Sequence, residues 1–312
     1  MLTPYTGKSE YCYANSLHMC LESAGAQAPD LPEVGFLECL TTMPFGNMYL
    51  RLADGPLVFF DAPTVDPDAG LTQALAALGW TCDEWFGDDE AEALARLRAA
   101  VQSAPALVGP LDLGELPYNP RAAYLRGGDH FVVALEVEDE QIRLHDPYGY
   151  PYAVVAPSDL LAAWRADRIT YKRGPFTLRS RFRQVEHVSR EESIARTLPL
   201  ARSNLIADPG GPVVFGGLRA LAMVAEDLRG EVPEALAGHL VYFAMPLAAR
   251  RCLDASAFVH EAGNDVAARH LERKARRFGE AQSFAVRHQW ASVVAIVEQL
   301  ADIERELIQA MA

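Results

Sequence analysis

The chain has 312 residues, of which 50% are hydrophobic and 22% are charged. These values are typical of an ordered globular protein of about two domains and exclude a disordered one. Its 42 acidic residues exceed its 28 basic ones, for a formal net charge of −14, which argues against a nucleic-acid-binding protein because neutralising phosphates requires an excess of Lys and Arg.

The N-terminal segment MLTPYTGKSEYC has no basic region followed by an apolar one, and no run of about 18 apolar residues occurs in the chain. A signal peptide and a membrane span are therefore not predicted, and we expect a cytoplasmic protein with no membrane partner. The five cysteines are odd in number and show no C-x-x-C spacing. We therefore expect no disulfide framework, no metal site and no cofactor.

A change of composition near residue 185 predicts two domains. Before it, Pro and Gly are frequent, and the apolar patterns predict helices over 12–24, 71–80 and 90–102 and strands over 57–60, 106–108, 131–137, 141–145 and 152–155. After it, Ala, Leu, Arg and Glu at helical spacing predict helices over 216–229, 233–262, 264–285 and 288–311. The fold class is therefore α+β, with an α+β domain over 1–185 and an all-α helical domain over 186–312 that serves as a lid, a partner-binding platform or a dimerisation module.

The first predicted helix begins at Cys12. A helix N-terminus offers a partial positive charge and unpaired backbone N–H groups, and both stabilise a thiolate. A lone cysteine is more often a buried structural residue. A nucleophilic role therefore depends on finding a base and a group that orients the base.

The segment over 130–147 predicts a β-hairpin that supplies both groups. His130 opens the first strand after a Gly-Gly-Asp turn, and Asp146 closes the returning strand, so the short turn brings the two side chains together. His130 is then the general base, and Asp146 orients its imidazole. Asp129 and His145 are rivals for these roles, but His145 alternates to the opposite face of the strand from Asp146, and we prefer the first assignment.

The order Cys, His, Asp resembles the papain-like cysteine enzymes, and the segment GGDHFVVALEVEDEQIRLHDPYGYP looks like their bacteriocin-processing peptidase branch. The segments YTGKSEYCYANSLHMCLESAG, GFLECLTTMPFG and LVGPLDLGELPY, with the helical region that follows, are more similar to the butirosin biosynthesis protein H family. This resemblance covers most of residues 5–180. It implies a papain-like catalytic domain that moves an acyl group from an acyl carrier protein or acyl-CoA thioester onto an amine.

The chain departs from papain-like hydrolases just before Cys12. Those enzymes carry a Gln there that helps to bind the oxyanion, and this chain has none. The backbone N–H of Cys12 can serve as one donor, and Lys8, Ser9 and Asn15 are candidates for the second. The departure disfavours peptide hydrolysis more than acyl transfer, because a thioester needs less stabilisation than an amide.

Two further sets of residues are candidates for binding. Apolar and aromatic side chains that would line a substrate site, or equally pack in a core, are Met43, Phe45, Tyr118, Tyr148 and Tyr150. Basic residues on one predicted helix that would dock an acidic carrier protein are Arg269, Arg273, Lys274, Arg276 and Arg277. Pairing with Glu272 and Glu280 on a solvated helix face explains the second set equally well.

The sequence therefore predicts an acyltransferase of natural-product biosynthesis that forms an amide bond through an acyl-S-cysteine at Cys12. Two alternatives stay open: a cysteine peptidase or amidase that uses water, and a non-catalytic protein that binds a carrier or a peptide. The partners expected are the thioester donor and an amine acceptor, without nucleic acid, and a homodimer is a further alternative.

Overall fold

The computed structural model describes residues 3–7, 10–27 and 31–312. They form two compact units: unit 1 combines Met1–Leu37 with Leu78–His187, and unit 2 combines Glu38–Ala77 with Val188–Ala312. The predicted boundary at residue 185 lies close to the second of these divisions. The sequence-based division differs for residues 38–77, which belong to unit 2 and not to the first domain.

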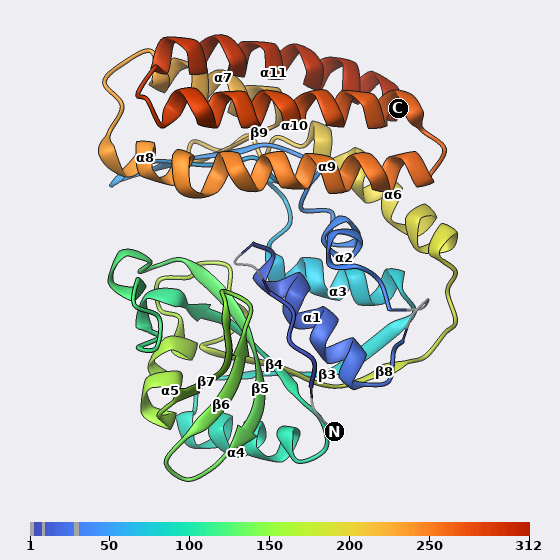
Figure 1. Cartoon of the computed structure of the whole chain (residues 1–312), viewed down its shortest axis with the longest axis vertical. Helices are drawn as coiled ribbons and strands as arrows, with labels where there is room; N and C mark the ends of the chain where they lie inside the picture. The colour runs from blue at the N-terminus through green and yellow to red at the C-terminus, as the bar shows by residue number, and fades with distance from the viewer. Residues whose placement is uncertain (1–2, 8–9, 28–30) are drawn as a thin grey trace. The chain divides into compact units, whose positions relative to one another are not determined.

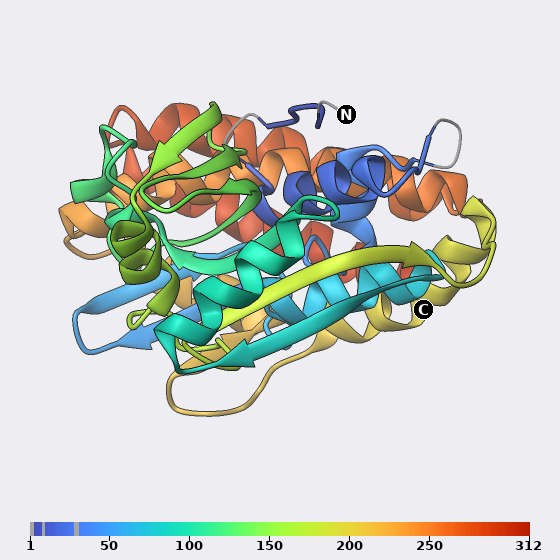
Figure 2. The same cartoon turned by 90° about the horizontal axis from the view of Figure 1, so that it is seen from below.

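Unit 1 is built on a six-stranded antiparallel sheet in the order β3-β8-β4-β5-β6-β7. Its strands are β3 (Trp80–Gly87), β4 (Ala106–Asp112), β5 (Asp129–Val137), β6 (Ile142–Asp146), β7 (Tyr150–Val155) and β8 (Phe176–Gln184). Four of them overlap predicted strands. The prediction missed β3 and β8, the long antiparallel pair of Figure 2, because charged residues interrupt their apolar alternation. These charges pair across the strands, as between Asp83 and Arg183 at 2.7 Å.

The helices of unit 1 are α1 (Cys12–Ser23), α4 (Glu90–Val101) and α5 (Pro157–Arg165), with short 3-10 turns η1 (Leu113–Glu115) and η2 (Ala122–Tyr124). Asp89 caps α4 by accepting the N–H of Glu92 at 2.7 Å. The core between α4, α5 and the sheet contains Leu97, Val132 and Trp164. Helix α1 lies outside that core and packs against β5, which matters for the site described below.

Unit 2 contains a three-stranded antiparallel sheet in the order β2-β1-β9. Its strands are β1 (Met48–Leu52), β2 (Gly55–Phe59) and β9 (Val214–Gly216). The prediction of an all-α second domain was therefore wrong in this respect, although the unit is mostly helical. The strand predicted over 57–60 overlaps β2, whereas β1 and β9 were not predicted. Strand β9 is three residues long, and its partner β1 lies far from it in the sequence.

The helices of unit 2 are α3 (Pro67–Ala77), α6 (Arg190–Ile206), α7 (Gly217–Leu228), α8 (Glu234–His239), the π-helical turn η3 (Leu240–Ala244), α9 (Met245–Glu261), α10 (Asp265–Ala285) and α11 (Trp290–Met311), while α2 (Val34–Leu40) carries the boundary between the units. Helix α10 lies beside both α9 and α11 (Figure 1). Tyr49, Phe215 and Phe278 share one apolar core, so both stretches of chain build it. The single helix predicted over 233–262 is interrupted at η3.

Among residues 3–7, 10–27 and 31–312, no helix combines the length and the apolar composition that a membrane span requires. No group of three or more His, Cys, Asp or Glu side chains there is arranged to hold a metal ion.

Candidate active site

Cys12 is the first residue of α1 and is partly exposed. The chain enters the helix through Tyr11, whose φ of 58° and ψ of 45° lie in the left-handed region. Asn15 stabilises this turn, because its Nδ2 donates to the backbone oxygens of Glu10 at 2.9 Å and Tyr11 at 3.0 Å. Both amide hydrogens of Asn15 are thus engaged, so Asn15 builds the helix start and is not the predicted oxyanion donor. The other two candidates, Lys8 and Ser9, lie outside the described residues.

Contacts between α1 and β5 bring Cys12 to His130. The hydroxyl of Ser16 donates to the backbone oxygen of Phe131 at 3.2 Å, and the rings of Tyr13 and Phe131 meet edge to face at 6.0 Å. Phe131 directly follows His130, and the Cys12 side chain lies near enough to His130 to contribute to the raised pKa of its imidazole. The helix start and the strand start therefore lie together.

Asp146 completes the group on the neighbouring strand. His130 Nε2 lies 2.6 Å from Asp146 Oδ1, and the two residues are 1% and 0% exposed. Because Nε2 contacts the carboxylate, Nδ1 is the ring nitrogen left for Cys12. The structure thus brings together the three residues that the sequence selected, in the order thiol, imidazole, carboxylate, all within unit 1.

The charges of this group stabilise one another. Burial lowers the pKa of His130, but the charge and hydrogen bond of Asp146, with a smaller contribution from Cys12, outweigh it and hold the pKa well above its usual value. Burial raises the pKa of Asp146, but His130 and the N–H of Tyr148 outweigh it and hold the pKa below its usual value. The imidazolium–carboxylate form is therefore favoured.

The N-terminal segment and two neighbouring tyrosines hold Asp146 in place. Its Oδ1 also accepts the N–H of Tyr148 at 2.7 Å, its Oδ2 accepts the hydroxyl of Tyr118 at 2.8 Å, and its backbone oxygen accepts the hydroxyl of Tyr5 at 2.9 Å. Gly7 packs so closely on Pro147 that a Cβ would lie 2.5 Å from the Pro147 Cα. Tyr5 and Gly7 were missed, because no sequence pattern links them to a residue 140 positions away.

The rival acid and base have other partners. His145 Nε2 contacts the backbone oxygen of Thr3 at 3.0 Å, and its Nδ1 accepts the N–H of Tyr152 at 3.2 Å. Burial lowers the pKa of His145, which favours its neutral form. Asp129 accepts the hydroxyl of Tyr171 at 2.7 Å. Both ring nitrogens of His145 are thus engaged away from Cys12.

The three tyrosines predicted to contact substrate form one cluster beside His130. The ring of Tyr148 meets His130 edge to face at 6.2 Å and stacks on Tyr150 at 6.5 Å, and Tyr118 meets Tyr150 at 5.6 Å. The hydroxyl of Tyr150 donates to Asn119 Oδ1 at 3.2 Å. The hydroxyl of Tyr118 donates instead to the carboxylate of Asp146. Asn119 itself is buried.

Met43 and Phe45 belong to unit 2 and not to the unit that carries Cys12. Both side chains are buried, and Phe45 packs against Phe258 with ring centres 6.2 Å apart. These contacts fit the packing alternative. That they line an acyl pocket stays a prediction.

The predicted docking residues lie on α10, but they do not make a basic face. Lys274 is 2% exposed and its Nζ lies 2.5 Å from Glu304 Oε2, so it cannot meet a partner. Three arginines of the set form ion pairs within the unit, namely Arg273 with Glu306, Arg276 with Glu272 and Arg277 with Glu280. The groove between α10 and α11 is lined by these three arginines and by three carboxylates. Arg269 is exposed.

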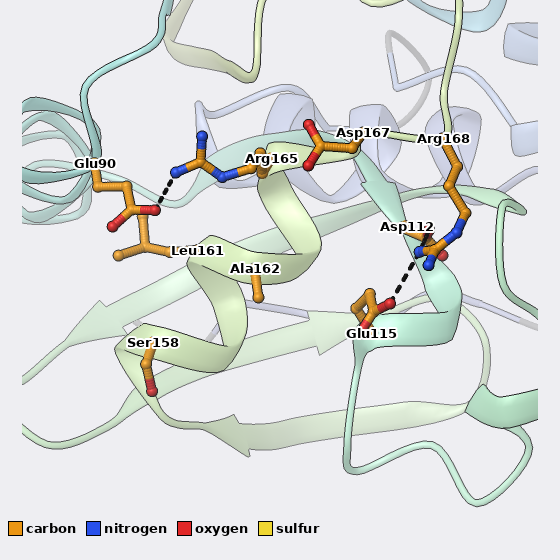
Figure 3. Close-up of a pocket in the computed structure, with 9 residues that line it drawn as sticks. All are labelled: Glu90, Asp112, Glu115, Ser158, Leu161, Ala162, Arg165, Asp167 and Arg168. Atoms are coloured by element: carbon orange, nitrogen blue, oxygen red, sulfur yellow. Dashed lines mark hydrogen bonds and ion pairs between the residues drawn. The ribbon is translucent and has the colours of Figure 1, made fainter.

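A pocket of about 670 Å³ lies beside α5 in unit 1 (Figure 3). Arg168 lines this pocket and donates to Asp112 and Glu115, both at 2.9 Å. Cys12, His130 and Asp146 do not line it. Asp112 nevertheless links the pocket to the site, since its Oδ1 accepts the N–H of Gly127 in the turn before His130. Sequence reasoning missed Asp112, which reads as an ordinary residue at a strand end.

Comparison with known proteins gives two findings. Residues 211–312 match the model of the YobF C-terminal domain. The chain is also 28% identical over 310 residues to the uncharacterized protein YobF of Bacillus subtilis (strain 168), covering 96% of this chain and 95% of that protein. The chain is similar to YobF over nearly its whole length. The matched YobF domain contains β9 and α7 to α11, and Cys12, His130 and Asp146 lie outside it.

Proposed function

We propose that the protein is a cysteine-dependent acyltransferase that moves an acyl group from a carrier-protein or CoA thioester, through an acyl-S-cysteine at Cys12, onto an amine. One observation carries the proposal: His130 Nε2 lies 2.6 Å from Asp146 Oδ1, and the Cys12 side chain lies near enough to His130 to contribute to its raised pKa. A nucleophile at a helix start, with its base and acid on adjacent antiparallel strands, fits a papain-like unit 1. The resemblance of its segments to the butirosin biosynthesis protein H family supports transfer in natural-product assembly.

In the first half-reaction, the Cys12 thiolate attacks the thioester carbonyl carbon. A bond forms between Sγ and that carbon, and the bond from the carbon to the donor sulfur breaks. The His130 imidazolium gives its proton to the departing donor thiolate, so a free thiol leaves and the imidazole becomes neutral. Asp146 stabilises the imidazolium before this step and keeps the ring oriented afterwards.

In the second half-reaction, an amine attacks the acyl-S-cysteine. Neutral His130 takes the proton that the amine loses as the carbon–nitrogen bond forms. The bond to Cys12 Sγ then breaks and releases an amide, which restores the thiolate and the imidazolium. The reaction needs no cofactor, because the thioester supplies the activation.

The engagement of Asn15 favours transfer from a thioester over cleavage of an amide. Its two amide hydrogens are bound to Glu10 and Tyr11, so Asn15 does not donate to an oxyanion. An amide needs more oxyanion stabilisation than a thioester does. Hydrolysis by the same group is therefore the second candidate, and its test is the fate of the acyl group.

Intact-mass measurement after incubation with acyl-CoA thioesters tests the proposal. We expect a single adduct of the acyl mass, absent in Cys12→Ala and retained in Cys82→Ala, since Cys82 is also partly exposed but burial raises its pKa to about 12. An added primary amine should discharge the adduct as an amide. Free acid released at a rate independent of the amine would indicate a hydrolase. Labelling that persists in Cys12→Ala would contradict both enzymes.

A further inference from the structure

We infer that Tyr118 is a positioning residue of this site: its hydroxyl holds the carboxylate of Asp146 in the orientation that His130 requires. The inference rests on the proposed function of Cys12, His130 and Asp146. It adds a fourth side chain to that group and gives one of the predicted substrate contacts a different role.

The hydrogen bonds on the two carboxylate oxygens carry the inference. Oδ1 receives His130 Nε2 at 2.6 Å and the N–H of Tyr148 at 2.7 Å, and Oδ2 receives the hydroxyl of Tyr118 at 2.8 Å. Rotation of the carboxylate would break all three bonds together. Tyr118 is the side chain that fixes Oδ2, and it thereby keeps Oδ1 directed at the imidazole.

The protonation states make Tyr118 the donor in this bond. Burial raises the pKa of Tyr118 well above 10, and the charge of Asp146 raises it further, so the phenol keeps its proton. Asp146 is the ionised partner and can only accept. A charge-assisted bond of this kind stabilises the carboxylate relative to the carboxylic acid.

The hydroxyl and the ring of Tyr118 make different contacts, so the positioning role can be tested apart from the packing of the ring. Tyr118 lies in the segment between η1 and η2, outside the strands that carry His130 and Asp146. Its ring contacts Tyr150, whose own hydroxyl donates to Asn119. The hydroxyl oxygen of Tyr118 is therefore the atom to remove, with its ring left in the cluster.

Tyr118→Phe tests the inference through the pH dependence of Cys12 alkylation by iodoacetamide, followed by mass. Loss of the donor should make Asp146 easier to protonate, so we expect the acid limb of the profile to move to higher pH by about one pH unit. The rate on the plateau should fall several-fold because the imidazole is less well oriented. Tyr171→Phe is the matched control, since its hydroxyl bonds a different carboxylate, Asp129, and its acid limb should stay in place.

Alkylation requires no acyl donor, so the outcome for Tyr118 can be distinguished from a failure of the acyltransferase proposal. An acid limb in Tyr118→Phe that coincides with that of the wild type would overturn the inference, as would an equal displacement in Tyr171→Phe. A second measurement covers a Tyr118→Phe protein that fails to fold. Carbon-13 NMR of the Tyr118 ring should give a pKa above 10 in the wild type and a lower one in Asp146→Asn, and an unchanged value would contradict the inference.

Discussion

One carboxylate oxygen of Asp112 accepts the backbone N–H of Gly127 at 2.9 Å, three residues before His130. The same oxygen accepts the N–H of Gly114 at 2.9 Å, so Asp112 ties together both ends of the segment between β4 and β5. Gly127 has a φ of +80°, which disfavours other residues in this turn. The position of the His130 ring thus depends on a carboxylate that does not touch it.

Asp112→Ala should weaken both the fold and the site. The change leaves two backbone N–H groups without their acceptor, and we expect it to lower the free energy of unfolding by about 2–4 kcal/mol and to slow Cys12 alkylation. Urea unfolding and the iodoacetamide rate measure the two effects. Arg168→Gln is the control, because it removes the half-exposed partner of Asp112 and leaves the turn bonded; an equal loss in both variants would contradict this account.

The buried pair of His130 and Asp146 should stabilise the protein in a defined range of pH. The pKa of His130 is higher in the folded than in the unfolded protein. Its contribution to the free energy of unfolding is therefore fully present below the unfolded-state pKa of about 6.5 and is lost as the pH rises through the folded-state pKa. The pKa of Asp146 is lower in the folded than in the unfolded protein. Its contribution to the free energy of unfolding is therefore present above the unfolded-state pKa of about 3.9 and is lost as the pH falls through the folded-state pKa. The contribution should therefore be largest between about pH 4 and 6.5.

Urea unfolding of the wild type and of Asp146→Asn across pH 4 to 9 measures this contribution. We expect a difference in unfolding free energy of about 3 kcal/mol at its maximum, which decreases toward alkaline pH. A difference that is constant over the whole series would show that the charge of the pair does not stabilise the fold.

Lys274→Met should destabilise unit 2 strongly. The substitution leaves Glu304 buried without its cation, and we expect a loss of about 3–5 kcal/mol in unfolding free energy. Adding Glu304→Gln should restore much of it, because the amide is neutral and can still bond Asn47. Arg276→Gln, at an exposed ion pair, should leave the urea midpoint unchanged. A stable Lys274→Met protein would reopen a surface role for this lysine.

Gly7→Ala should disturb the site through the backbone. The new Cβ would meet the Pro147 Cα and carbonyl oxygen, both at 2.5 Å, so the N-terminal segment must move away from the residue that follows Asp146. We expect slower Cys12 alkylation and a lower melting temperature, measured by mass and by circular dichroism. Gly211→Ala, whose Cβ would meet nothing within 4 Å, should behave like the wild type in both measurements.

Local pattern was enough to predict α1 and the β5–β6 hairpin. Cys12 begins a helix whose apolar face is regular, and His130 and Asp146 lie in strands joined by a short turn, so adjacent chain segments determine their approach. The same regularity predicted α10 and α11 to within two residues at their ends. The apolar spacing and turn residues that predict each of these elements lie within one continuous stretch of sequence.

Long-range packing determined what the sequence did not predict. Met43 and Phe45 have the composition of a binding loop, but their burial depends on helices more than 100 residues later in the chain. Arg273 and Lys274 belong to a basic run on α10, and their acidic partners Glu306 and Glu304 lie on α11, which is a separate segment of the sequence. Tyr118 was chosen for its aromatic ring, whereas its hydroxyl determines its place in the structure.

The division of the chain into units has a consequence for protein synthesis. A ribosome finishes residues 38–77 before it begins residues 78–187, and only after those does it make the helices that share the core of Tyr49 and Val58. At about 5–20 residues per second, the β1–β2 hairpin waits on the order of 10 s for its partners. All of unit 1 is synthesised before the helices of unit 2, so the apolar side chains of the β1–β2 hairpin lack their core partners throughout that interval.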